Sequence, residues 1–477
     1  MKNGRRDAMT QYVDSVNGRY RSDLLMNMGM VLVALLPIVT GIVLYALVQS
    51  SSYFADIKGN PTVVAVPIMA EGFIISVVIY RMYARLRDHS KRDSAWRKSL
   101  INYAGMYTHD LKELKDIDRE GDEIGSFPGI HPARILMVVL YLCMVLLFFW
   151  LLPSHSEKAS AFAAVSGIVL AVLMFVTVFA KVLSFPYRHE HNQITFVSCF
   201  RKVMAPYGVN VEVMEPVVEH RELWKHLVLA VVTLGLYAVV LMYSALKSMN
   251  EHMKSQWIYE DRLYVILRKD CYRKVTKEEP EDGDHVSTRS HYVRMPPVLI
   301  AAELFMAVIC VTYVLRLVAA GCDIYMSPSE YDLTLLAENL RGLGLSDSID
   351  FLMRYVMVVL QATLLATTVN AMMTIASRRP KAWRNVVINC VTFALPVWLS
   401  QAIYDPASTV HLFDLDPVLT TVVLVVLLVL LMVSRPVREF YTPATMDVPG
   451  AKEWIKYAFC GDLKVGEDFD FMDGTED

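Results

Sequence analysis

The chain has 477 residues, of which 55% are hydrophobic and only 20% are charged, and its mean hydropathy is positive. This composition is typical of an integral membrane protein, and a formal net charge of −3 offers no basic surplus for binding nucleic acid. The seven cysteines are scattered and form no C-x-x-C pair, so the sequence predicts neither a disulfide framework nor a cysteine-ligated metal.

Nine long apolar runs follow one another along the chain. They cover residues 24–48, 61–80, 134–152, 160–183, 227–246, 297–320, 351–376, 386–403 and 417–433. A helix needs about 20 mostly apolar residues to cross a bilayer, because each residue rises about 1.5 Å and the hydrocarbon core is about 30 Å thick. We therefore predict an all-α polytopic bundle of transmembrane helices with eight or nine spans.

The runs and the polar segments between them predict four regions. The first is an N-terminal four-helix membrane region (1–183) that includes a cytoplasmic segment (83–132). The second (184–296) consists of cytoplasmic segments on either side of the run 227–246, a candidate re-entrant element. The third is a C-terminal four-helix membrane region (297–433), and the fourth is an acidic cytoplasmic tail (434–477). The last dozen residues of the tail are rich in acids and are expected to be disordered.

The positions of Lys and Arg predict how the chain is oriented, because cytoplasmic loops carry the excess of both. The N-terminal tail has five basic residues, the segment 83–132 has nine and the segment 184–225 has five, whereas the loop 49–60 and the turn 153–159 have one each. We therefore expect a multi-pass protein of the cell (cytoplasmic) membrane, with the N-terminus and these basic segments in the cytoplasm.

The same rule fails at the run 227–246. The segment 247–296 carries ten basic residues, although one crossing by this run would place the segment outside. Three explanations are open: the run dips into the membrane and returns, it crosses and leaves a basic segment outside, or a further span lies within 191–214. The last would bury Arg201 and Lys202 at about 2.5–3.5 kcal/mol each. The first gives eight crossings with both termini in the cytoplasm.

This run also contains a short motif. Residues 233–237 read T-L-G-L-Y, and the polar segment 249–252 that follows reads M-N-E-H. Residues 221–265 resemble a module of uncharacterised prokaryotic membrane proteins that contains a T-L-G-[IL]-Y element, often followed by an N-x-H segment. The resemblance implies a partly inserted element with basic flanks, and it implies no known activity.

Two polar segments are predicted to be helical. The segment 83–126 predicts two helices with a break near Gly105, which extend the second span into the cytoplasm. In the segment 249–274, apolar residues recur at helical spacing, which indicates a helix that lies on the membrane surface or packs on its neighbours. Residues 275–296 are expected to be a flexible linker.

Two carboxyl groups lie at membrane depth in this arrangement. Glu71 is about ten residues from each end of its run, or about 15 Å from either membrane surface. A carboxyl at that depth has to be protonated, paired or facing water. It is therefore either a proton or cation site or a protonated group that bonds a neighbouring helix. Glu303 lies six residues inside its own run and can meet a partner from another helix.

The run 351–376 is the most polar of the nine. Thr363, Thr367, Asn370 and Thr374 follow one another at steps of four, three and four residues, which places them on one helical face. Such a face either hydrogen-bonds to other helices or lines a pore.

No pattern in the sequence predicts catalysis. The segment His189-Glu190-His191 suggests a metal, but residues two apart on a helix do not share a face, and no second cluster completes a site. We therefore expect solvated loop histidines here. The sequence has no H-E-x-x-H, G-x-S-x-G, P-loop or G-x-G-x-x-G motif. It predicts no catalytic residue, no metal ligand and no cofactor, and it leaves open a membrane enzyme with a site of scattered polar residues.

Two functional hypotheses follow. The first is a transporter or channel-like protein for a small solute or ion, with a path lined by Glu71, Glu303, Thr367 and Asn370. The second is a non-catalytic membrane scaffold or sensor that uses its cytoplasmic segments as interaction surfaces. The lipid bilayer is the only partner that the sequence predicts, and nucleic acid is excluded.

Overall fold

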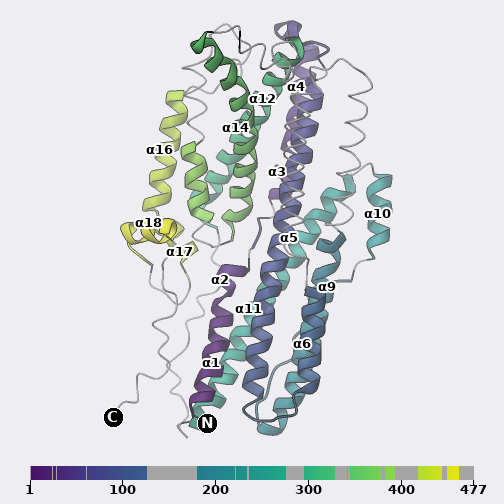
Figure 1. Ribbon diagram of the computed structural model, residues 1–477, viewed down its shortest axis with the longest axis vertical. Helices are drawn as coiled ribbons and strands as arrows, with labels where there is room; N and C mark the ends of the chain where they lie inside the picture. The colour runs from purple at the N-terminus through teal and green to yellow at the C-terminus, as the bar shows by residue number, and fades with distance from the viewer. Residues whose placement is uncertain are drawn as a thin grey trace.

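The computed structural model of the protein is an elongated bundle of long helices (Figure 1). The structure describes residues 2–23, 25–27, 29–60, 62–125, 180–220, 222–233, 236–275, 295–327, 341, 344–377, 382–392, 417–442 and 448–460. Every regular element within these residues is a helix. The prediction of an all-α chain is confirmed for this part of the sequence.

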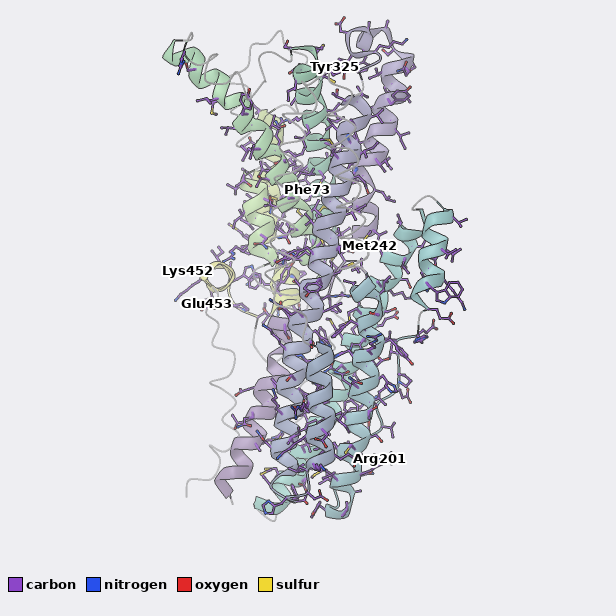
Figure 2. All side chains as sticks on the ribbon, turned by 45° about the vertical axis from the view of Figure 1, so that its right-hand side comes forward. Phe73, Arg201, Met242, Tyr325, Lys452 and Glu453 are labelled. Carbon is purple, nitrogen blue, oxygen red and sulfur yellow. The ribbon has the colours of Figure 1, made fainter. Side chains whose placement is uncertain are left out.

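Two very long helices run through the bundle and divide it into two parts. Helix α5 (Thr62–Ala104) has 43 residues and α11 (Leu236–Val275) has 40. At 1.5 Å per residue each is about 60 Å long or more, roughly twice the thickness of a bilayer's hydrocarbon core. Figure 2 shows the two parts along α5, with Phe73 in the upper one and Arg201 of a neighbouring helix near the lower end. We call them the apolar region and the polar extension.

The apolar region is built around a large hydrophobic core that includes Ile74, Val78, Tyr313 and Trp383. Its elements are α3 (Met30–Ala34), α4 (Leu36–Ser50), η1 (Ser52–Ile57), the first half of α5, α12 (Pro297–Met326), α14 (Leu345–Ile375), α16 (Pro417–Val433), α17 (Arg435–Tyr441) and α18 (Ala451–Cys460). Apolar side chains also cover its outer surface, as at Ile42 and Leu304. A helix that is apolar on every side suits lipid surroundings.

Three helices of the described residues are long and apolar enough to cross a membrane: α5, α12 and the part Tyr355–Ile375 of α14. A fourth is obtained if α16 and α17, which meet at 63°, are counted as one bent span. Eight or nine spans are therefore not confirmed. The run 134–152 and nearly all of 160–183 lie outside the described residues, as do the linker 276–294 and the last residues of the tail.

The run 227–246, for which the sequence leaves three explanations open, is not one continuous helix. It is divided between α10 (Leu223–Val232) and α11. The rings of His226 and Tyr237 stack with centroids 5.8 Å apart, and His226 Nδ1 lies 2.8 Å from the Tyr237 hydroxyl. Eleven residues of continuous helix would hold these two positions about 16 Å apart. The chain therefore reverses direction between them and forms a helical hairpin.

The polar extension has a second hydrophobic core, in which Tyr12, Trp96, Phe196, Phe200 and Leu267 are buried. Its elements are α1 (Lys2–Asn17), α2 (Arg19–Ser22), the second half of α5, α6 (Lys112–Gly125), α9 (Ala180–Met204), η3 (Ala205–Tyr207) and the lower part of α11. The predicted break near Gly105 is confirmed, because α5 ends at Ala104 and α6 begins at Lys112.

The helix predicted in 249–274 is also confirmed, as part of α11. Its residues Met249, Met253 and Leu267 are buried, so this helix packs on its neighbours and does not lie on a membrane surface. At the other end of the chain, Trp454 of α18 is buried against Trp383 and Tyr441, so part of the predicted tail docks onto the apolar region. Both cores draw on several of the four predicted regions.

Replacement of Trp96 tests whether the polar extension has its own core. The Trp96 ring is fully buried between Phe196 and Tyr259, with ring centroids 6.4 and 6.5 Å away. We expect Trp96→Ala to lower the free energy of unfolding by about 3–5 kcal/mol, because it removes a large buried side chain and leaves a cavity. Chemical denaturation of the detergent-solubilised protein measures this loss. The control Val265→Ala, at a half-exposed position of α11, should cost less than about 1 kcal/mol. Equal losses for the two variants would contradict the assignment.

Candidate metal centre

A layer of buried polar side chains separates the two hydrophobic cores. On α5, the residues of the upper core end at Leu86 and those of the lower core begin at Trp96. The polar layer is made up of Asp23, which follows α2, together with His89, Arg92 and Asp93 of α5, His189, Glu190 and Gln193 of α9, and His252, Gln256 and Glu260 of α11. Each of these residues is at most 5% exposed. Burial of so many polar groups is costly unless they bind one another or a ligand.

Three histidines of this layer converge from three helices. His89, His189 and His252 pack edge to face, with ring centroids 5.0, 5.4 and 5.5 Å apart. One ring nitrogen from each can be chosen so that all three lie within 4.8 Å of one another. The Nε2 atoms of all three rings are buried and have no hydrogen-bond partner among the described residues. Three buried rings, each with an unpartnered Nε2, therefore meet in one enclosed place.

Carboxylates hold the opposite nitrogens of two of these rings. His89 Nδ1 lies 3.0 Å from Asp23 Oδ1, and His252 Nδ1 lies 3.0 Å from Glu190 Oε1. Because an ionised carboxylate only accepts hydrogen bonds, each Nδ1 carries a proton and each Nε2 keeps its lone pair. This carboxylate–histidine pairing is the usual support for a metal-ligating imidazole. Asp93 Oδ2 lies 4.0 Å from Nε2 of the third ring, that of His189.

The electrostatics of the layer keep these groups in the forms that metal binding requires. Burial and the neighbouring histidines hold the pKa of His189 well below its usual value, so that its ring is neutral. Burial by itself raises the pKa of Glu190, but its bonds with His252 and with the amides of Val218 and Val217 outweigh this and lower it. The carboxyl of Glu190 is therefore ionised.

Each carboxylate is in turn fixed by further partners. Asp23 accepts hydrogen bonds from Arg92 Nε at 3.1 Å and from Trp257 Nε1 at 2.7 Å. Glu190 Oε2 accepts bonds from the backbone amides of Val217 and Val218 at 3.1 and 2.7 Å. Because these carboxylates cannot turn freely, the rings that they bond are oriented before any ligand arrives.

Arginines balance the carboxyl groups of the layer. The layer has four carboxyl groups, and the buried arginines in or beside it are Arg19, Arg85, Arg92 and Arg97. Glu260 pairs with Arg92, and the pKa of Glu260 is nevertheless raised to about 7, because burial outweighs the attraction of Arg92 and Arg19. The three histidines, and not a surplus of negative charge, are therefore the groups that point to a bound cation.

Among the described residues, no hydrogen bond links the four residues that the sequence predicts for an ion or solute path. Glu71 is buried on α5, and its Oε2 has no hydrogen-bond partner within the described part of the chain. Glu303 of α12 accepts a hydrogen bond from Asn27, which supplies the partner expected from elsewhere in the chain. Thr367 is exposed and donates to the carbonyl of Leu364 at 3.1 Å.

Asn370 is half-buried, and its Oδ1 has no partner among the described residues. The polar face of α14 does not point to a single interior, because Thr363 and Thr367 are exposed whereas Thr374 is buried. The buried polar residues of this helix also include Gln361 and Thr368, from its other face. The path therefore stays a prediction.

The histidine cluster was not predicted from the sequence. The expectation of loop histidines is wrong for both His189 and His191, because both lie on α9, and the expectation of solvation holds for the exposed His191 but not for the buried His189. The two residues do point to different sides, as their spacing requires. The partners of His189 come from α5 and α11, so no local motif collects them. The sequence signals that bear on the site are the H-E-H segment, which contains His189 and Glu190, and the N-x-H segment around His252.

No family model, no curated protein and no solved structure matches this chain. The resemblance of residues 221–265 to a module of prokaryotic membrane proteins therefore stays a prediction.

Replacement of Asp23 tests whether its carboxylate supports the layer. We expect Asp23→Ala to lower the free energy of unfolding at neutral pH by about 3–5 kcal/mol, because Arg92 loses a buried partner. Burial raises the pKa of Asp23, but Arg92 and His89 together lower it far below the usual value. The contribution of Asp23 is thus present above the unfolded pKa of about 3.9 and lost as the pH falls below it.

Denaturation of the detergent-solubilised protein at pH 7 and near pH 3.5 measures both effects. The difference in the free energy of unfolding between wild type and Asp23→Ala should be smaller at the lower pH. The control is Glu212→Ala, which removes an exposed carboxylate 3.4 Å from the exposed Arg262 and should cost about 1 kcal/mol or less. A difference between wild type and Asp23→Ala that grows as the pH falls would contradict the stabilising role of the ionised Asp23 carboxylate.

Proposed function

We propose that this protein is an integral membrane protein that binds a divalent transition-metal ion, of the class of zinc, through His89, His189 and His252. The observation that carries the proposal is the set of three buried Nε2 atoms without partners, on rings whose ligand atoms lie within 4.8 Å. Three imidazoles form a frequent ligand set for zinc and leave a fourth position for water or a further ligand. Imidazole also suits copper, nickel and iron, whereas magnesium and calcium prefer oxygen.

The enclosure of the site favours the hypothesis of a scaffold or sensor over that of an enzyme. Its three ligands are at most 4% exposed, so a substrate has no open route to the metal among the described residues. The ligands belong to α5, α9 and α11, and one ion would therefore cross-link three helices at the junction of the two cores. Such a site would make the polar extension more rigid when metal is present.

The charge distribution supports an orientation with the metal centre on the cytoplasmic side. Apart from Glu71, the first half of α5 is apolar, and the other charged residues of the helix begin at Arg81. His89 lies eight residues further on, about 12 Å beyond that boundary. The polar extension contains the N-terminal tail with five basic residues and most of the segment 83–132 with nine, and the positive-inside rule favours a cytoplasmic location for it.

Zinc binding by ligand variants tests the proposal. We expect the wild-type protein to retain about one equivalent of zinc after removal of free metal, as measured by mass spectrometry of the purified protein. His189→Ala should weaken zinc binding at least 100-fold in competition with a chromophoric chelator, because a direct ligand is lost. Glu190→Gln should weaken it 10- to 100-fold, because the His252 ring loses its anionic support.

The matched control is His191→Ala, two residues from His189 on the same helix but exposed. It should leave the affinity for zinc unchanged. Equal zinc retention in His189→Ala and His191→Ala would show that bound zinc lies elsewhere and would overturn the proposal.

A second candidate function is cation transport, which the position of Glu71 favours. Glu71 precedes His89 by eighteen residues, which is five turns of helix, so both lie on the same face of α5 about 27 Å apart. The buried carboxyl of Glu71 and the proposed metal ligand His89 thus lie on the same face of one helix. Glu71 would serve as a cation-binding group within the membrane.

Transport measured in proteoliposomes tests this second function. We expect the wild-type protein to carry zinc into vesicles that contain a fluorescent chelator, and Glu71→Gln to slow the uptake at least tenfold without loss of zinc bound at the histidines. The control Glu251→Gln, at an exposed position of α11, should transport as wild type does. Zinc binding without any uptake by the wild type would leave the scaffold or sensor as the function.

A further inference from the structure

The hairpin of α10 and α11 presents an apolar surface that the rest of the protein does not cover. Figure 1 shows α10 at the outer edge of the bundle, beside the upper end of α11. On α10, Trp224, Val228, Leu229 and Val232 are exposed, and Val232, its last residue, is 72% exposed. On the facing part of α11, Val240 and Tyr243 are exposed as well. Outward apolar side chains in this number mark a surface that contacts something other than water.

The polar groups near the tip of the hairpin are satisfied within it. The Thr233 hydroxyl donates to the carbonyl of Leu229 at 2.7 Å and accepts a bond from the amide of Tyr237 at 3.0 Å. The His226 ring is bonded to the Tyr237 hydroxyl. Polar groups in the hydrocarbon core of a bilayer need hydrogen-bond partners within the protein, because no water is present there to bond them.

Charged residues bound the apolar part of the hairpin on both arms. Lys225 pairs with Glu222 near the start of α10, and Lys247 lies 3.8 Å from Glu251 on α11. These four side chains are about half exposed. Lys225 is eight residues from Thr233, and Lys247 is eleven residues from the start of α11, which corresponds to about 12 and 16 Å of helix. Both arms therefore turn polar at a similar distance from the tip.

The geometry points to a re-entrant hairpin: α10 and the first turns of α11 insert tip-first into the cytoplasmic leaflet, with Val232 among the lipid acyl chains. Its apolar length of about 12–16 Å matches half of a hydrocarbon core of about 30 Å, so the hairpin enters the bilayer and does not cross it. Lys225, Lys247 and Trp224 lie where headgroups are expected, and these residue types favour that position.

This arrangement also accounts for the distribution of basic residues. The segment 184–225 carries five basic residues and the segment 247–296 carries ten, and a re-entrant hairpin leaves both in the cytoplasm. A soluble protein partner would not require charges at matching distances on both arms. The inference rests on the membrane location that we propose above, but not on the metal centre.

Site-specific labelling in proteoliposomes tests the inference. Single cysteines are introduced as Val232→Cys at the tip, Leu304→Cys on the outer face of α12 and Val213→Cys in the exposed segment after α9, each in the full chain with its native cysteines replaced. Each is labelled with an environment-sensitive fluorophore. We expect the label at position 232 to be quenched at least threefold more by nitroxide-labelled lipid than by aqueous iodide, as at position 304, with the reverse at position 213.

The two control positions separate the possible failures. Iodide quenching at 232 together with lipid quenching at 304 would overturn the hairpin inference and leave the membrane location intact. Iodide quenching at both positions would overturn the membrane location itself. Protection of 232 from both quenchers, with chemical cross-linking to a second copy, would identify a protein contact and would also overturn the inference.

Discussion

The carboxylate of Asp23 is the interaction on which the rest of the structure depends. It follows the short helix α2 and bonds Arg92 and His89 of α5 and Trp257 of α11, so one group ties the N-terminal segment to both long helices. These contacts lie where the upper core ends and the lower core begins. Loss of this carboxylate would leave Arg92 with Glu260 as its remaining buried partner, which costs more than the loss of a surface ion pair.

Two hydrophobic cores on either side explain why the polar layer is so completely buried. Tyr12 and Trp96 close it from below, and Met253 and Leu86 close it from above. In such surroundings electrostatic interactions are strong, so the carboxylates hold their histidine partners in one tautomer and one orientation. The same enclosure makes three unpartnered imidazole nitrogens expensive. A bound metal ion, as we propose, would relieve that cost.

The long helices connect this chemistry to the membrane. Helix α5 continues without a break from Glu71 to His89, so one element joins the apolar region to the metal centre that we propose. Helix α11 does the same between the hairpin and His252. The proposed function needs a structural link of this kind between the two parts of the protein.

Local features of this protein could be predicted from its sequence because they depend on neighbouring residues. The lengths of the apolar runs predicted the all-α class, helical periodicity predicted the helix within 249–274, and the charge pattern with Gly105 predicted the break between α5 and α6. The spacing of His189 and His191 correctly indicated that they face different sides. The failure of the positive-inside rule at 227–246 pointed to an apolar run that reverses direction.

Tertiary structure alone decided which of these faces meet. His89, His189 and His252 are far apart in the chain, and only the packing of α5, α9 and α11 brings them together. The polar face of α14 shows the converse, since Thr363 and Thr367 share a face that the bundle leaves exposed. A repeat of 3.6 residues determines the direction of a side chain on its own helix, whereas its neighbour depends on how helices from distant segments pack.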